Sequence, residues 1–279
     1  MRKRENSKFL NCALNDSSQG LEQRGCEEFI GILDCMGSLR VGTAGWNVPR
    51  AYADLFGKSG SHLERYAAVM NCVEVNSSFY RPHQLKTWEK WAAATPTGFR
   101  FAVKAPKTIT HMARLVNCGE ALVEFLEQVA GLGEKLGPML FQLPPKGVFD
   151  ASVARDFLST LREMYSGQVV LEPRHMSWFG GEADRSLREF AVGRVAADPP
   201  QGSDLAARPG GYEGLRYYRW HGSPRVYWSA YGSERIGGLA GELAGYGMGE
   251  SWVIFDNTAA GAALGDAMEL VAKAGDSGA

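Results

Sequence analysis

The strongest constraint on the fold is an eightfold alternation of short apolar runs with amphipathic segments. Each run has the length of a strand, and most are followed by residues whose apolar members recur every three or four positions. This alternation is typical of parallel strands joined by helical crossovers. Eight such units in about 240 residues fit the size of a (β/α)8 barrel. The expected strands lie within residues 39–45, 72–77, 99–106, 138–145, 168–175, 193–200, 216–223 and 251–259.

A doubly wound open sheet is the alternative, because periodicity alone does not separate the two folds. The first expected strand runs into "GTAGW", residues 42–46, which lacks the GxGxxG spacing of a dinucleotide-binding loop. We therefore predict an α/β fold with a single TIM-type (β/α)8 barrel at residues 39–279. Residues 1–38 are polar and irregular, and we expect them to form a loosely structured, flexible extension.

Composition restricts the partners of the chain. The hydrophobic fraction of 45% is sufficient for a large core, and the formal net charge of -1 gives no general attraction to nucleic acid or acidic membranes. No apolar run approaches the roughly 20 residues that span a bilayer. The basic N-terminus is not followed by an apolar segment, so we expect no secretory signal and a cytoplasmic location. The oligomeric state stays open.

Polar residues stand at the carboxyl ends of the expected strands, where a barrel of this type carries its active site. Strand alternation supports a shared direction: Glu74 and Asn76 lie on one face, and Val73 and Val75 on the other. We predict as catalytic residues Glu74, Lys104, Glu172, His221 and Asp256. We predict as substrate-binding residues Asn76, Tyr80, Gln142, Arg174, Trp178, Asp198, Arg219, Arg225 and Asn257.

These residue types favour acid/base chemistry on a small polar anion, such as a sugar phosphate or a nucleotide. Glu74 and Glu172 are the candidate carboxylates, and His221 is an alternative acid/base group because imidazole titrates near neutrality. Lys104 and Arg174 would bind or polarise the anionic group of the substrate. Hydrolase, lyase and isomerase reactions all stay open.

The same residues allow other interpretations. Glu172 and Arg174 could form an internal ion pair, because buried charges are costly unless they are paired. A non-catalytic barrel that binds a metabolite or nucleic acid is the rival function. No local ligand motif is present and no cofactor is predicted, although a divalent metal could be held by the set Glu74, Glu172, Asp198, His221 and Asp256.

The loops raise two further alternatives. Arg225 and the segment "FDNTAAGAA", residues 255–263, could receive a phosphate, with Asn257 capping the helix that follows. Asn257 could equally cap that helix and do nothing more. Tyr80 and Trp178 could stack on a sugar or a base, or simply anchor their loops to the barrel.

Ordered motifs at the strand ends also resemble a known family. They include "RVGTAGW", "VEVNSSFYR", "LGPMLFQLPP", "LEPRHMSWF", "YYRWHGSPRVYWSAYG" and "WVIFDNTAAGAA". The chain is similar, from about residue 40 to near its end, to the YecE-like family, catalogued as domain of unknown function 72. The resemblance implies a TIM-type barrel and supplies no activity.

Overall fold

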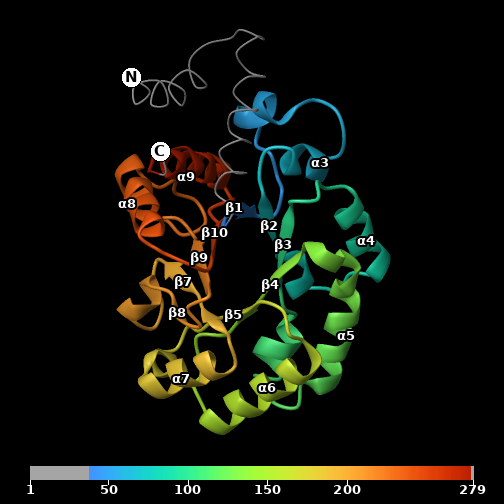
Figure 1. Ribbon diagram of the computed structural model, residues 1–279, viewed down its shortest axis with the longest axis vertical. Helices are drawn as coiled ribbons and strands as arrows, with labels where there is room; N and C mark the ends of the chain where they lie inside the picture. The colour runs from blue at the N-terminus through green and yellow to red at the C-terminus, as the bar shows by residue number, and fades with distance from the viewer. Residues whose placement is uncertain (1–37, 278–279) are drawn as a thin grey trace.

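Parallel strands form the centre of the molecule, and helices surround them (Figure 1). The computed structural model describes residues 38–277, so the predicted flexible extension lies outside the described residues except for Ser38. Each expected strand range overlaps an observed strand. The strands are β1 (Leu39–Ala44), β2 (Cys72–Val75), β3 (Arg100–Lys104), β4 (Leu136–Gln142), β5 (Val169–Glu172), β6 (Gly193–Arg194), β7 (Ala196–Asp198), β8 (Gly210–Gly211), β9 (Leu215–Trp220) and β10 (Glu250–Phe255).

The sheet closes on itself through the short strands β6 and β7. Hydrogen bonds connect the strands in the order β7-β9-β10-β1-β2-β3-β4-β5-β6-β8. Val195 alone separates β6 from β7, and its N–H donates to the carbonyl of Leu171 at 3.0 Å. Residues 193–198 therefore act as one strand that pairs with β5 on one side and with β9 on the other. With β8 as a small antiparallel addition, the eight-stranded TIM-type barrel predicted from the sequence is confirmed.

Helices follow most strands and cover the outside of the barrel (Figure 1). They are α3 (His62–Ala67), α4 (Leu85–Ala93), α5 (Gly119–Val129), α6 (Ala151–Met164), α7 (Gly181–Glu189), α8 (Ser233–Ala244) and α9 (Ala262–Ser277). Short helical turns lie at Arg50–Phe56, Ser77–Phe79, Thr108–Met112, Ala130–Lys135, Met176–Phe179 and Asp204–Ala207. Among the helices that the structure describes, none combines the length and apolar character needed to cross a bilayer.

Local sequence explains where these helices begin and which side they bury. The carboxylate of Asp150 accepts hydrogen bonds from the backbone N–H groups of Ser152 and Val153, which starts α6. On the same helix Phe157 and Leu161 are buried, because their spacing places them on one face. This face packs in the outer core, between the helices and the sheet.

A second apolar layer fills the inside of the barrel. Its members come from alternate positions of the strands and are Cys72, Ala102, Leu140, Val170, Val195, Leu215, Tyr217, Trp252 and Ile254. The ring of Trp252 stacks on that of Tyr217, with centroids 6.1 Å apart. Packed apolar side chains therefore fill the barrel interior, and the polar groups lie beyond this layer, at the carboxyl ends of the strands.

The tight fit around Trp252 predicts a sensitive position. A methyl group at Gly137 would lie 2.6 Å from Cη2 of Trp252, so Gly137→Ala should lower the free energy of unfolding by about 1–3 kcal/mol. Urea unfolding measures the change. The control is Gly241→Ala in α8, where the added methyl meets nothing within 4 Å. This substitution should raise the free energy of unfolding by about 0.5–1 kcal/mol, because alanine favours a helix more than glycine does. An unchanged stability of Gly137→Ala would contradict the packing described here.

Candidate functional site

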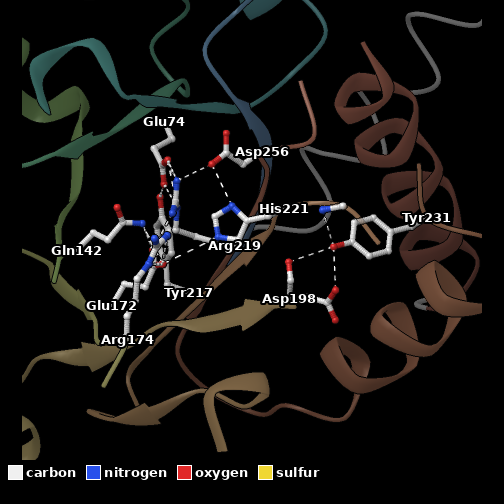
Figure 2. Close-up of polar contacts among 11 residues, drawn as sticks. Glu74, Gln142, Glu172, Arg174, Asp198, Tyr217, Arg219, His221, Tyr231 and Asp256 are labelled. Carbon is white, nitrogen blue, oxygen red and sulfur yellow. Dashed lines mark hydrogen bonds and ion pairs between the residues drawn. The ribbon is translucent and has the colours of Figure 1, made fainter. Parts of the chain in front are cut away.

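On several strands, an inward-facing polar residue stands two positions after a residue of the inner apolar layer. Ala102 is followed by Lys104, Leu140 by Gln142, and Val170 by Glu172, so the alternation of each strand directs these side chains to the same end of the barrel. Figure 2 shows the resulting cluster, which joins side chains from several strands around one guanidinium. We call this end of the barrel the mouth. Its polar residues are Glu74, Asn76, Lys104, Gln142, Glu172, Arg174, Arg219, His221 and Asp256.

Arg219 on β9 is the centre of the cluster and is fully buried. Its Nη2 lies 2.8 Å from Oε1 of Glu74 and 2.9 Å from Oδ2 of Asp256, and its Nη1 lies 2.7 Å from Oε2 of Glu172. Burial alone would lower the pKa of Arg219, but these three carboxylates raise it well above its usual value. One guanidinium therefore contacts carboxylates from three other parts of the barrel.

Glu172 on β5 is held as an anion from several sides. Arg219 binds one oxygen, Nε and Nη2 of Arg174 donate to Oε1 at 3.1 Å each, and Nε2 of Gln142 lies 3.0 Å from both oxygens. Burial opposes ionisation, but the charges of Arg219 and Arg174 outweigh it and hold the pKa of Glu172 far below its usual value. A carboxylate stabilised in this way does not carry a proton near neutrality, so it is poorly suited to the predicted acid/base role.

Glu74 on β2 is also enclosed. Its side chain is fully buried, accepts two near-parallel hydrogen bonds from Nε and Nη2 of Arg219, and accepts a third from the hydroxyl of Tyr217 at 2.8 Å. This geometry is that of an internal ion pair that ties β2 to β9. Glu74 is thus a structural support of the mouth.

His221 and Asp256 form a pair at the edge of the cluster. Nδ1 of His221 lies 3.1 Å from Oδ2 of Asp256, whose side chain is 15% exposed. Burial acts to raise the pKa of Asp256, but the hydrogen bond to His221 and the charge of Arg219 bring it below its usual value. Nε2 of His221 is buried 4.0 Å from Oε1 of Glu172 and has no hydrogen-bond partner among residues 38–277. Asp256 thus contacts Nδ1, and Nε2 is the ring nitrogen that stays without a partner.

Lys104 at the end of β3 is a buried cation of a different kind. Its Nζ lies 4.3 Å from the centroid of the Phe79 ring, and its side chain has no ion-pair partner in the part of the chain that the structure describes. Burial, and then the charge of Arg219, lower the pKa of Lys104 to about 8. A lysine with this pKa is still mostly protonated at pH 7 but loses its proton readily.

Asp198 does not face the mouth, contrary to the expectation from its place at a strand end. It lies two residues after Ala196, which packs in the outer core, so strand alternation turns its side chain outward. There it accepts a hydrogen bond from the hydroxyl of Tyr231 at 2.9 Å and pairs with Arg235, apart from the cluster in Figure 2.

Asn257 is likewise turned outward, two residues after the outer-core residue Phe255. Its Nδ2 donates to the carbonyl of Ser229 at 2.9 Å and to Oδ2 of Asp266 at 2.6 Å. Burial is the main reason that the pKa of Asp266 is raised to about 6. Asn257 therefore ties loops to α9, and its predicted place in substrate binding has no geometric support.

Of the three predicted loop residues, one is buried and two lie at the surface. Trp178 is 3% exposed, and its indole N–H donates to the carbonyl of Gly147 at 2.9 Å, so it anchors its loop. Tyr80 is 71% exposed, and Arg225 lies over the ring of Trp228 at 4.2 Å. Tyr80 and Arg225 therefore stay available to a ligand at the surface.

Two residues that touch the cluster are not among the predicted site residues. Tyr217 precedes Arg219 by two positions, so the alternation that selects Arg219 could also have selected Tyr217. Phe79 lies in a short turn after β2, and no pattern in the sequence places its ring under Lys104.

The acidic residues do not converge as a metal site would require. In residues 38–277, no group of three or more His, Cys, Asp or Glu side chains is arranged to hold a metal ion. The guanidinium of Arg219 occupies the space between Glu74, Glu172 and Asp256, and Asp198 points elsewhere. The predicted five-residue metal set is therefore not assembled in this geometry.

Comparison with known sequences places this barrel in a family. The sequence profile described as "Protein of unknown function DUF72" matches residues 40–279. The chain belongs to the DUF72 family. This confirms the resemblance noted from the strand-end motifs, and the family's description names no activity.

Similar proteins agree with this assignment. The DUF72 chain is 34% identical over 142 residues to UPF0759 protein YecE of Escherichia coli (strain K12), an alignment that covers 49% of the chain and 52% of YecE. It is 29% identical over 153 residues to UPF0759 protein YunF of Bacillus subtilis (strain 168), covering 50% and 51%. The chain thus spans about half the length of the curated relatives it matches.

Solved structures show the same fold. A DUF72 family protein from Enterococcus faecalis V583 superposes with a TM-score of 0.71 at 20% identity, covering 85% of this chain and 95% of that one. A DUF72 family protein from Thermotoga maritima MSB8 gives a TM-score of 0.66 at 23% identity, covering 83% and 97%. At these identities the comparison supports the barrel fold alone.

The role of Arg219 as the common counter-ion predicts a stability effect with a characteristic pH dependence. Arg219→Met leaves buried carboxylates uncompensated and should cost about 3–5 kcal/mol at pH 8. The unpaired carboxylates would then have pKa values above those of the unfolded chain, so the native state would take up protons and the loss should shrink at pH 5. In the wild type the pKa of Glu172 is depressed, so its stabilisation is present above about pH 4.5 and is lost as the pH falls below that value.

Urea unfolding at pH 8 and pH 5 measures both effects. The control is Arg155→Met, which breaks an exposed ion pair with Glu189 and should change stability by about 0–1 kcal/mol at either pH. The role of Arg219 as counter-ion would be contradicted if Arg219→Met lost no more stability than Arg155→Met, or if its loss of stability were larger at pH 5 than at pH 8.

Proposed function

We propose that the chain is an enzyme that carries out acid/base chemistry on a small polar anionic substrate, such as a sugar phosphate or a nucleotide, in the mouth of the barrel. The observation that carries this proposal is the side chain of Lys104, which is 9% exposed and whose amine makes no ion pair with an anion in residues 38–277. A buried charge costs several kcal/mol unless an opposite charge compensates it. The nearest carboxylates already face Arg219, so the anionic group of a ligand is a fitting partner for Lys104.

Arg174 supports the same interpretation. Its Nε and Nη2 donate to Glu172, while its Nη1 makes no hydrogen bond to the described residues, and its side chain keeps 16% of its surface exposed. Burial, and then the charges of Lys104 and Arg174, lower the pKa of His111, which shows that both cations act on one region. A phosphate or carboxylate there would meet an ammonium and a planar guanidinium.

The acid/base part of the proposal rests on His221. Its Nε2 is buried and has no hydrogen-bond partner in the described chain, and Asp256 orients the ring through Nδ1. A base oriented in this way is used in hydrolysis, elimination and isomerisation alike. Glu74 and Glu172 would then hold Arg219 and Arg174 in place rather than exchange protons.

One observation favours the rival function, a barrel that binds a metabolite without transforming it. The carboxylates of Glu74 and Glu172 are committed to ion pairs, so the mouth lacks the free acid that many hydrolases use. Binding of nucleic acid and the cytoplasmic location stay predictions from the sequence.

A thermal-shift screen of phosphorylated sugars, nucleotides and small carboxylates tests the proposal. A ligand at about 100 times its Kd should raise the free energy of unfolding by about 2.7 kcal/mol. Lys104→Met should abolish this gain while leaving the unliganded protein as stable as the wild type or more so, because a buried unpaired cation is removed. Lys107→Met, which changes an exposed lysine three residues further on, should keep the gain.

Incubation of each ligand with the protein, followed by NMR of the small molecule, separates catalysis from binding. Turnover that is lost in His221→Asn while the thermal shift persists would support the enzyme. Ligands that bind at Lys104 and are never converted would establish the rival function. A marked loss of stability in unliganded Lys104→Met would count against both.

A further inference from the structure

Lys104 has the surroundings of a nucleophilic amine rather than those of a simple anion receptor. Its side chain is 9% exposed and its Nζ stands over the face of the Phe79 ring, with neither a carboxylate nor a hydrogen-bond acceptor bound to it within the described residues. Burial, and then the charge of Arg219, lower the pKa of this amine, and together they outweigh the opposing charges of Glu74, Glu172 and Asp256. Desolvation and a neighbouring cation are the two devices by which proteins make a lysine reactive.

The consequence is a larger fraction of free amine. A pKa of about 8 leaves about one amine in ten unprotonated at pH 7, against fewer than about one in a thousand for a lysine with its usual pKa. Only the unprotonated amine attacks a carbonyl carbon.

We propose that Lys104 is the nucleophile of this site and forms an imine with a substrate whose carbonyl adjoins an anionic group, such as a 2-oxo acid. This inference rests on the proposed function only in taking the mouth as the place where the anion binds. In a 2-oxo acid the carboxylate and the carbonyl carbon are directly bonded. If the carboxylate of the substrate binds the free Nη1 of Arg174, its carbonyl carbon is held close to that guanidinium. Lys104 and Arg174 both act on His111, so this places the carbonyl in the region where the amine of Lys104 acts.

The chemical step needs no reagent beyond water and a proton. The lone pair of Nζ attacks the carbonyl carbon, the C–N bond forms, and one amine proton passes to the oxygen to give a carbinolamine. A second proton, supplied by water at the open mouth, lets this oxygen leave as water. The product is a protonated iminium that keeps one proton on nitrogen.

The surroundings of Lys104 suit this product. The iminium carries the same positive charge as the ammonium and stays over the Phe79 ring, whose face stabilises cations. β2 and β3 pair through Val75 and Val103, so Asn76 and Lys104 occupy the next positions along the two strands. Oδ1 of Asn76 is buried and has no hydrogen-bond partner in residues 38–277, and it is an available acceptor for the N–H of the iminium.

Reductive trapping tests the inference on the full chain. The protein is incubated with glyoxylate or pyruvate and sodium cyanoborohydride at pH 7, and the modified lysines are located by peptide mass spectrometry. We expect Lys104 to be modified at least about tenfold faster than Lys107 and Lys146, two exposed lysines on neighbouring loops. Lys104→Arg, which keeps the positive charge and cannot form an imine, should lose the fast modification and keep any thermal stabilisation by the same acids.

The outcomes separate the two proposals. Thermal stabilisation by 2-oxo acids without modification of Lys104 would overturn the imine and leave the anion site standing. Fast modification of Lys104 without stabilisation by any anion would support the nucleophile and count against the proposed anionic substrate. Modification spread evenly over the lysines would overturn the nucleophile.

Discussion

The buried guanidinium of Arg219 is the interaction on which the mouth of this barrel depends. It forms ion pairs with carboxylates from β2 and β5 and with the one that follows β10, and the guanidinium is fully buried. Without a cation at this point, these anions would be too costly to bury together. The same charge makes Glu172 more acidic and Lys104 less basic. Arg219 therefore acts on the ionisation of both groups.

This arrangement joins two interpretations that the sequence leaves as alternatives. Glu74 and Glu172 form the internal ion pairs that a purely structural network would contain, and their hydrogen-bonding capacity is directed at Arg219, Arg174 and neighbouring polar groups. Lys104 feels the charges of this network but makes no hydrogen bond or ion pair with it among the described residues. Because the hydrogen bonds of the carboxylates go to Arg219 and its neighbours, the amine makes no direct ion pair and stands beside an aromatic ring, while Glu74, Glu172 and Asp256 act on its charge at longer range.

The family comparison and the geometry answer different questions. Solved DUF72 structures that cover most of this chain establish the barrel, while a shared barrel says little about chemistry. Within the described chain, three atoms of the mouth are without hydrogen-bond partners and could meet a ligand: Nζ of Lys104, Nη1 of Arg174 and Nε2 of His221. These atoms lie at the end of the barrel where enzymes of this architecture bind their substrates.

The eight strands, the helices between them and the end of the barrel at which polar residues gather could all be predicted from the sequence, because they follow from local apolar periodicity. Applied to Ala196 and Asp198, the same periodicity would also have turned Asp198 outward. The charges that meet could not be predicted in this way, because their contacts join residues far apart in the chain. Glu74 contacts Arg219 across 145 positions and Tyr217 across 143, since closure of the barrel brings distant strands together. The low pKa of Lys104 arises in the same way: it depends on burial and on the distance to Arg219, which exist only once the barrel is closed.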